Sequence, residues 1–271
     1  MVTADVQTLA SESGCHLFSG CGFPSPGLNV FEFKPIFSIG AFDFTKPMLL
    51  ALISMLLVIG FFWSAFAKPK MVPRGAQNVG ELGYLFVRDN ISRETMGKKG
   101  DPYVPFLFSI FFFVWVMNVM AIIPFAQFPA TSRIAFPASI VGVVYVTYLV
   151  LGIKNQGFVG YFKNMMFPPG LPKAIYFLLA PIELLQGLIT RPFTMAVRLF
   201  ANMFAGHMLI VTFSVGAWYL LGFHIGALFS ATSFIVVVIL TAFELMIQAL
   251  QAYIITLLAA SYISSSLEAE H

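Results

Sequence analysis

The chain has 271 residues, of which 59% are hydrophobic and only 10% are Asp, Glu, Lys or Arg. Soluble domains carry about 25% charged residues, and a water-soluble fold with this composition would expose large apolar patches. The composition therefore excludes an ordinary soluble domain and indicates an integral membrane protein. The formal net charge is only +3, so the charge balance does not indicate a nucleic-acid partner.

Residues 1–45 form a tail before the first long apolar run, and the tail carries the only two cysteines, Cys15 and Cys21. We see no cleavable signal peptide, because the apolar run begins late and the leading residues are acidic rather than basic. If the tail lies outside the cytoplasm, the two cysteines are able to form a disulfide. In a reducing compartment they would remain separate thiols.

The rest of the chain, residues 46–271, is predicted to be one all-α membrane domain. A helix needs about 20 apolar residues to cross the bilayer, and a helix satisfies its own backbone groups in lipid. Five stretches are long and apolar enough. The predicted spans are 47–67, 103–127, 134–153, 176–219 and 227–264.

Two segments depart from the simple pattern of spans and loops. Residues 78–91 place apolar side chains at near-helical spacing beside charged ones, which predicts an amphipathic helix in the membrane surface or a helix in a soluble loop. The fourth span would be about 65–70 Å long as a straight helix, against a hydrocarbon core of about 30 Å. It must be tilted, kinked at Pro181 or Pro192, or broken, and with the fifth span it forms a long hairpin.

The basic residues decide the predicted orientation. Ten of the fifteen Lys and Arg residues lie in the loops after the first and third spans, whereas the loop between the second and third spans holds only Arg133. We therefore expect the two basic loops to be cytoplasmic. The N-terminal tail is then outside, and His271 is in the cytoplasm.

Charged side chains inside the last two spans mark the candidate site, because charge within the membrane is costly and usually functional. They are Glu183, Arg191, Arg198 and Glu244. Glu183 and Arg191 lie near the predicted cytoplasmic boundary, where snorkelling would explain them equally well. Arg198 lies deep in an apolar stretch and keeps its proton in any protein environment. It needs an anion, which is either a functional carboxylate from elsewhere or a structural partner such as Glu244 or Glu183.

Polar residues extend the candidate site along both helices. Asn202 follows Arg198 by one turn on roughly the same face, whereas His207 lies on the opposite side, about 13–14 Å further along. His207 is either a proton relay or a hydrogen-bonded histidine between packed helices. One face of the fifth span is polar, which predicts a water-lined path, with contact between helices as the alternative. The stripe consists of Thr241, Glu244, Gln248 and Gln251.

The sequence does not indicate a metal or nucleotide site on this chain. His207, His224 and Glu244 lack the spacing of a known zinc site, and we find no phosphate-binding loop or nucleophile motif. We therefore expect no metal, no cofactor and no catalysis on nucleotides.

Four sequence blocks resemble one family. The block RPFTMAVRLFANMFAGH, residues 191–207, is similar to the signature of subunit a of the bacterial rotary F-type ATP synthase. ELMIQALQAY, residues 244–253, resembles the last helix of that family. NVMAIIP, residues 118–124, and FVRDN, residues 86–90, also fit, so the resemblance covers roughly residues 44–262.

The resemblance implies a stator subunit in the plasma membrane of a bacterium. Its partners would be a rotating ring of subunit c, the peripheral-stalk subunit b and the rest of the ATP synthase, with nucleotide catalysis on other subunits. Arg198 matches the essential arginine of the family. The resemblance implies a proton pathway of Asn202, His207, Glu244, Gln251 and Glu183. Gln248 joins this pathway as a member of the polar stripe.

The physics is compatible with this role. A ring carboxylate in lipid is neutral because desolvation raises its pKa, and a nearby arginine favours its charged form. Arg198 would therefore cause the ring carboxylate to release its proton. Its fixed positive charge would also block a direct transfer of protons between two offset half-channels.

The main alternative is a secondary cation–proton antiporter that uses Glu244 and Arg198 alone. It would need a self-contained binding site and usually internal repeats, and we find neither in the sequence. A membrane scaffold without transport is a third reading.

Overall fold

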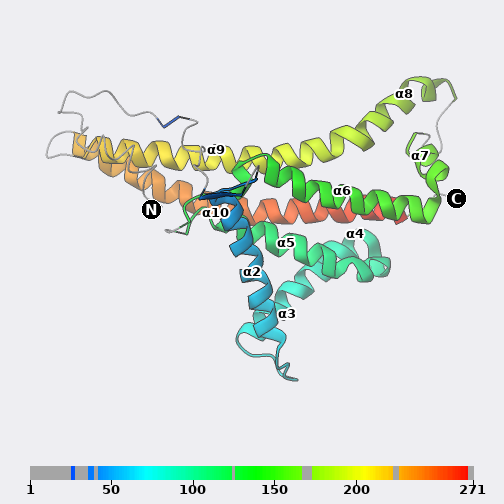
Figure 1. The fold of residues 1–271 in the computed structure, drawn as a ribbon, viewed down its shortest axis with the longest axis horizontal. Coiled ribbons are helices and arrows are strands. Elements are labelled where there is room, and N and C mark those ends of the chain that lie inside the picture. The colour runs from blue at the N-terminus through cyan, green and yellow to red at the C-terminus, as the bar shows by residue number, and fades with distance from the viewer. Residues whose placement is uncertain are drawn as a thin grey trace.

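The computed structural model describes residues 26–27, 36–39, 42–123, 126–166, 173–221 and 226–267. Five of its helices are long and apolar enough to cross a membrane, which confirms the predicted all-α membrane fold. Figure 1 shows that the longest helices lie side by side along the long axis, while an N-terminal pair projects away from them. Cys15, Cys21, His224 and residues 268–271 lie outside the described residues, so the expectations about a disulfide and a zinc site stay untested.

A short hairpin precedes the first span. Strands β1 (Phe37–Ile39) and β2 (Phe42–Phe44) pair antiparallel, with Phe37 opposite Phe44. The sequence analysis did not predict this hairpin, because three-residue strands are too short to show an alternating pattern. Helix α2 (Lys46–Phe66) follows directly, with Pro47 in its first turn, where proline is well tolerated.

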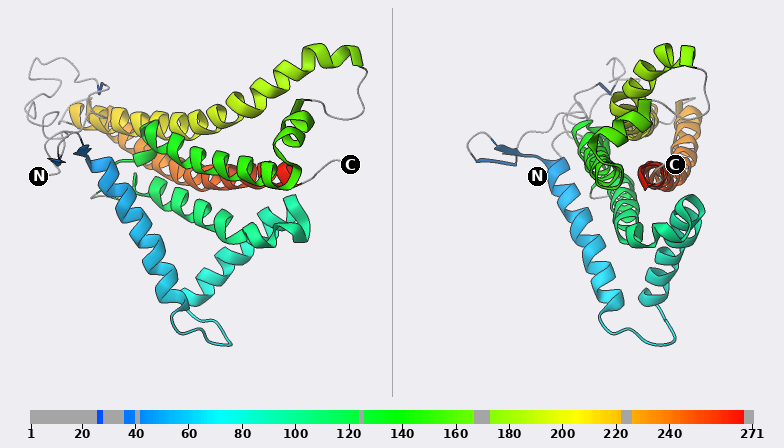
Figure 2. Two further views of the ribbon diagram at one scale, coloured as in Figure 1. Left: turned by 45° about the vertical axis from the view of Figure 1, so that its right-hand side comes forward. Right: turned by 90° about the vertical axis from the view of Figure 1, so that its right-hand side faces the viewer.

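The basic loop after α2 leads into helix α3 (Ala76–Val87), which continues through the π-helix η3 (Arg88–Arg93). Helix α4 (Glu94–Met96) and the 3-10 helix η4 (Gly97–Tyr103) then lead into α5 (Val104–Val119). Figure 2 shows α2 and α3 diverging from the connecting loop like the arms of a V. The second span ends as a helix at Val119, earlier than the predicted residue 127, and the chain turns at residues 120–123.

The third span is α6 (Ala135–Gln156), preceded by the short 3-10 helix η5 (Ala130–Ser132). Gly157 has a φ of 74°, which permits a sharp turn into α7 (Phe158–Met166). Before α6, the hydroxyl of Thr131 donates a 2.7 Å hydrogen bond to Oδ1 of the buried Asn118 on α5. This bond ties the start of the third span to the end of the second.

The fourth span is continuous but irregular: α8 (Lys173–Leu185) passes through the π-helix η6 (Gln186–Thr190) into α9 (Arg191–Tyr219). Pro192 has no N–H for the carbonyl four residues earlier, and the wider π-turn accommodates this interruption. The hydroxyl of Tyr148 on α6 donates a 3.1 Å hydrogen bond to the carbonyl of Gly187 inside the π-helix. In Figure 1, α8 bends away from the other long helices beyond this point.

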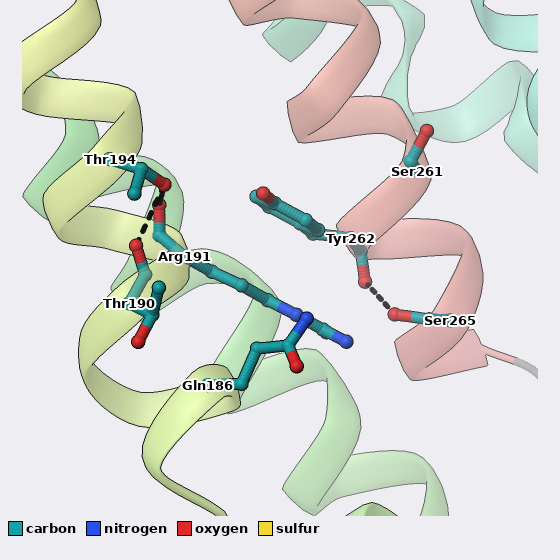
Figure 3. A pocket seen from close by; sticks show the side chains of 7 residues that line it. All are labelled: Gln186, Thr190, Arg191, Thr194, Ser261, Tyr262 and Ser265. Atoms are coloured by element: carbon teal, nitrogen blue, oxygen red, sulfur yellow. Dashed lines mark hydrogen bonds between the residues drawn. The ribbon is translucent and has the colours of Figure 1, made fainter. Parts of the chain in front are cut away.

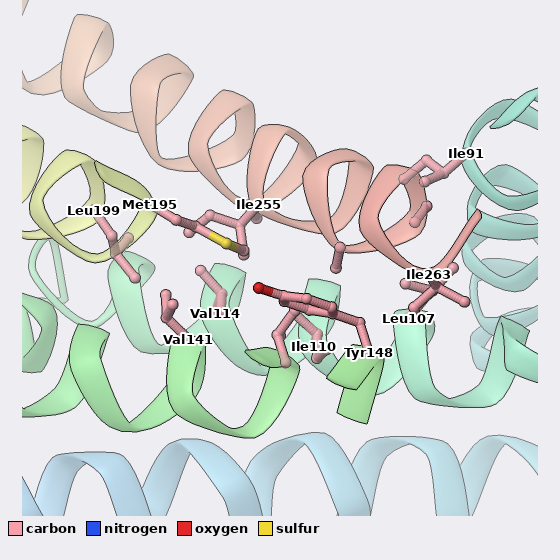
Figure 4. Packing of buried hydrophobic residues seen from close by; sticks show 14 of the residues in the cluster. Ile91, Leu107, Ile110, Val114, Val141, Tyr148, Met195, Leu199, Ile255 and Ile263 are labelled. Carbon is pink, nitrogen blue, oxygen red and sulfur yellow. The ribbon is translucent and has the colours of Figure 1, made fainter. Parts of the chain in front are cut away.

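Helix α10 (Gly226–Leu267) is the fifth span and runs antiparallel beside α9. Its buried face carries small residues that let neighbouring helices approach closely: Ala252, Ala259 and Ala260 are completely buried. Figure 4 shows the apolar core between α5, α6, α9 and α10. Its labelled members include Leu107, Val114, Val141, Met195, Leu199, Ile255 and Ile263.

Candidate functional site

Two contacts fix how α9 and α10 are aligned. The amide Nδ2 of Asn202 donates a 2.8 Å hydrogen bond to Oε1 of Gln251, and the guanidinium carbon of Arg191 lies 5.6 Å from the centre of the Tyr262 ring. The two contacts are eleven residues apart on each helix. Between these two contacts each step along α9 therefore corresponds to one step back along α10. Arg198, seven residues after Arg191, thus lies level with Ile255, seven residues before Tyr262.

Arg198 lies on the exposed surface of α9. Within the described part of the chain it forms no ion pair and no hydrogen bond, so the structural pairing with Glu244 or Glu183 considered from the sequence is not present. The neighbouring Ala201 and Ala205 are also exposed. Small side chains beside an unpaired cation allow another helix to approach it closely.

Beyond Arg198, the predicted polar stripe is buried between α9 and α10. Glu244 is 5% exposed, Gln248 is fully buried and Gln251 is 1% exposed. A Cβ placed on Gly206 would lie 3.4 Å from both Cδ and Oε1 of Glu244, so the carboxylate packs directly against the backbone of α9. Thr241, the first member of the stripe, is only half-buried and donates to the carbonyl of Val237 on its own helix.

His207, the residue after Gly206, is buried on the side of α9 away from the exposed Arg198. Its ring meets that of Phe128 edge to face, with centres 5.8 Å apart and an interplanar angle of 84°. The structure thus places His207 and Arg198 in different surroundings, as the sequence predicted from their spacing.

Several buried polar atoms in this region lack a hydrogen-bond partner among the described residues. They include Oε1 of Glu244, Nε2 of Gln251 and both polar atoms of the Gln248 amide. Leaving such an atom unsatisfied costs about 1–3 kcal/mol, and buried polar groups are normally paired with protein or ordered water. Packing contact alone does not explain a stripe with four unsatisfied atoms.

On the other side of Arg198, a pocket of about 420 Å³ opens between the start of α9 and the end of α10. Figure 3 shows the side chain of Arg191 extending from α9 toward α10, which carries Tyr262. Thr194, which also lines the pocket, lies one turn before Arg198. The full lining consists of Gln186, Thr190, Arg191, Thr194, Ser261, Tyr262 and Ser265.

Glu183 lies outside the pocket lining, half-buried on α8. Glu183 lies eight positions before Arg191, so in a regular α-helix the two side chains would point about 80° apart around the helix axis. The π-helix between them takes up one extra residue, so Glu183 comes within about 20° of the face of Arg191. Its helix face therefore points the same way as the face that carries Arg191 and Arg198.

The sequence analysis missed two groups of polar residues. The hydroxyls of the pocket gave no signal, because Thr and Ser in membrane helices commonly bond to their own backbone carbonyls. The pair of Asn118 and Thr131 gave none either, since it joins residues of different elements.

The described residues do not bring three His, Cys, Asp or Glu side chains together as a metal site would require. The arrangement on α9 and α10 is instead one exposed arginine between two polar regions. One region holds the buried stripe with its carboxylate and the nearby His207 of α9, and the other is a pocket lined by residues with hydroxyl groups and by a guanidinium.

Comparison with known proteins gives a consistent result. The family model described as ATP synthase A chain matches residues 48–264. ATP synthase subunit a of Streptomyces lividans is 51% identical over 100% of this chain and 97% of that protein. The proteins of the same name from Frankia alni (48% identical, over 91% of this chain and 86% of that protein) and Rhodococcus erythropolis (39% identical, over 99% and 96%) are also similar. The chain therefore belongs to the ATP synthase A chain family, as subunit a of a bacterial, proton-translocating F-type ATP synthase.

Proposed function

We propose that this chain is the stator that carries protons past a rotating ring of subunit c, through two half-channels that are offset on either side of Arg198. The observation that carries the proposal is the position of Arg198. It is exposed and unpaired among the described residues, level with the buried Ile255, and it separates the buried polar stripe from the pocket.

The buried stripe is suited to the outer half-channel. Glu244, His207, Gln248 and Gln251 lie beyond Arg198 toward the predicted outer ends of α9 and α10. The unsatisfied polar atoms of Glu244, Gln248 and Gln251 are the groups that water and moving protons would use. Asn202, bonded to Gln251, is the last polar residue of this region before Arg198.

The pocket is suited to the inner half-channel. It begins one turn from Arg198, at Thr194, and reaches Ser265 near the predicted cytoplasmic end of α10. The π-helix turns Glu183 onto the same face as the pocket, where its carboxylate would receive protons at the cytoplasmic mouth. Ring carboxylates would enter the stator neutral, lose their protons near Arg198 and regain protons from the other half-channel.

The energy for rotation would come from the membrane potential, about 2.3 kcal/mol per proton per 100 mV. Nucleotide catalysis would belong to other subunits of the ATP synthase, and the peripheral-stalk subunit b would hold this chain against the ring. We also infer that the N-terminus is outside and the C-terminus is in the cytoplasm of a plasma membrane.

Disulfide cross-linking tests the proposal. In a chain with Cys15→Ser and Cys21→Ser, Ala205→Cys should cross-link to cysteines placed on the outer helix of subunit c, because Ala205 is exposed two turns beyond Arg198 on the same face of α9. Val143→Cys, exposed on α6, is the matched control and should not cross-link. Equal cross-linking of both variants, or of neither, would contradict a ring on the Arg198 face.

The antiporter reading makes a different prediction. The purified chain alone, in liposomes with a sodium or potassium gradient, would then exchange cations for protons. We expect no exchange, because the carboxylate of Glu244 and the guanidinium of Arg198 lie in separate surroundings and do not form one binding site.

A further inference from the structure

We propose that Arg191 makes the pocket selective, by excluding metal cations such as Na⁺ from a cavity whose oxygen atoms would otherwise bind them. The inference rests on the proposed function, in which this pocket is the route of protons between Arg198 and the cytoplasm. It adds a residue that determines specificity for the ion.

The first observation is the direction in which the hydroxyl groups of the pocket donate. Thr194 donates to the carbonyls of Thr190 and Arg191, at 2.7 and 3.1 Å. Ser261 donates to Leu257 at 3.0 Å, and Ser265 donates to Tyr262 at 2.9 Å. These hydroxyl protons are committed to the backbone, so the oxygens can act only as acceptors toward a ligand in the cavity.

Oxygen lone pairs are the ligands that hard cations prefer. The residues that line the cavity of about 420 Å³ carry these three hydroxyl groups, the amide of Gln186 and the hydroxyls of Thr190 and Tyr262. The cavity is large enough to hold a cation with part of its hydration shell. Without a positive charge in the wall of the cavity, these oxygen-bearing groups would bind Na⁺ favourably.

The second observation is the fixed positive charge in the same wall. Arg191 lies over the ring of Tyr262 at 5.6 Å, a cation–π arrangement that holds the guanidinium at the cavity. Arg191 forms no ion pair with the carboxylates of the described residues. Glu183, on the same face, lies two turns away on the far side of the π-helix.

A unit charge about 5 Å away, at an effective dielectric constant of about 20, lowers the occupancy of a monovalent cation on the order of a hundredfold. The same charge also disfavours an excess proton in the cavity, but that proton passes along water and is taken up by a carboxylate, whereas a bound metal cation would remain in the cavity and block the route. Arginine in a pore wall rejects cations, protons included, so the selectivity would come from preventing Na⁺ from binding to the oxygen atoms of the pocket. Because Na⁺ greatly outnumbers protons near neutral pH, such exclusion would keep the route open to protons.

The test uses the complete ATP synthase in liposomes, with ATP and the salt added outside, on the side of the pocket. We compare the rate of ATP-driven acidification in NaCl with the rate in choline chloride at the same concentration, so that ionic screening is equal. The wild-type ratio is the reference. Arg191→Gln should lower the ratio, whereas Arg191→Lys, which keeps the charge, should leave it near the reference.

A second pair of variants keeps Arg191 in place. Ser265→Glu puts a carboxylate opposite the guanidinium, neutralises the pocket and should make acidification sensitive to Na⁺, whereas Ser265→Gln should not. If Arg191→Gln does not assemble, the Ser265 pair decides. Ratios equal to that of the wild type in both Arg191→Gln and Ser265→Glu would overturn the inference. Absence of acidification in the wild type would instead contradict the proposed function.

Discussion

Asn202 and Gln251 join the two longest helices of the protein one turn beyond Arg198, through a hydrogen bond of 2.8 Å in which the asparagine amide donates to the glutamine carbonyl. The bond aligns α9 with α10 at the level where the exposed arginine gives way to the buried polar stripe. It leaves Nε2 of Gln251 buried and without a partner among the described residues. The carbonyl oxygen of Gln251 thus holds the two helices together, and its amide nitrogen is available to the proposed proton pathway.

We expect Asn202→Ala and Gln251→Ala each to slow ATP-driven proton pumping several-fold, with the double variant little worse than the slower single one. The reason is that both remove the same hydrogen bond, worth about 0.5–1.5 kcal/mol, so their effects are coupled. The measurement is a double-mutant cycle on pumping rates. Thr241→Ala is the control, since its hydroxyl bonds only to its own helix. Additive effects of the two substitutions would show that the bond does not act in transport.

Gly206 provides a steric test of the Glu244 position. A Cβ there would lie at ordinary contact distance, 3.4 Å, from the carboxylate, so Gly206→Ala should pump at near the normal rate. Gly206→Val adds two methyl groups that displace Glu244 and should slow pumping strongly. Gly216→Val on the same helix is the matched control, because nothing lies within 4 Å of its Cβ position. If both valine variants behave alike, Glu244 does not act from this place.

Glu244→Gln and His207→Ala should slow proton flow without preventing assembly. Each removes one titrating group, while Asn202, Gln251 and water remain to carry protons. Passive proton flux through the membrane sector, with the amount of subunit measured by immunoblot, checks this. Normal flux in both variants would mean that the buried stripe only packs the helices together.

Arg198→Ala should abolish both ATP-driven pumping and proton-driven synthesis while the protein stays in the membrane. No carboxylate of the described residues pairs with Arg198, so a structural ion pair is not lost. Arg198→Lys should also fail, since a desolvated lysine sheds its proton and lacks the guanidinium fork. The alanine variant should leak protons, because the barrier between the half-channels is gone. Coupled ATP synthesis by an assembled Arg198→Ala enzyme would refute the role of this residue.

The orientation makes a prediction for the C-terminus. In a chain with Cys15→Ser and Cys21→Ser, His271→Cys should react with a membrane-impermeant thiol reagent only in inverted vesicles, because the proposed orientation, with the basic loops inside, puts that end in the cytoplasm. A cysteine at position 3 should show the opposite pattern. Labelling of residue 271 from outside in sealed, right-side-out vesicles would be incompatible with five spans.

The sequence predicts the spans and the buried stripe because both depend on short-range periodicity. Runs without charge mark α2, α6 and α10 to within three residues at each end. The spacing of Glu244, Gln248 and Gln251 places them on one face of a helix, and the structure buries all three. The same spacing rule separates His207 from Arg198.

The other features of the fold and the site depend on contacts between separate elements, which the periodicity of the sequence does not reveal. The π-helix at residues 186–190 changes the face of Glu183, and it arises from Pro192 together with the contact of Tyr148 with Gly187. The pocket depends on the alignment of Arg191 with Tyr262, which lie 71 residues apart in the sequence. A hairpin of two three-residue strands is likewise too short to be predicted from pattern.

The alignment of α9 with α10 has an electrical consequence. Thr194 at the pocket and Asn202 at the stripe are eight residues apart, or about 12 Å along a helix, whereas the hydrocarbon core is about 30 Å thick. With both polar regions filled with water, the whole voltage drop falls across this short apolar layer at Arg198 and Ile255. If α9 is tilted, this layer takes up at most about 12 Å of the membrane normal. The local field would then be at least about two and a half times steeper than across lipid, so the force on a carboxylate of the proposed ring would be greatest where it passes the arginine.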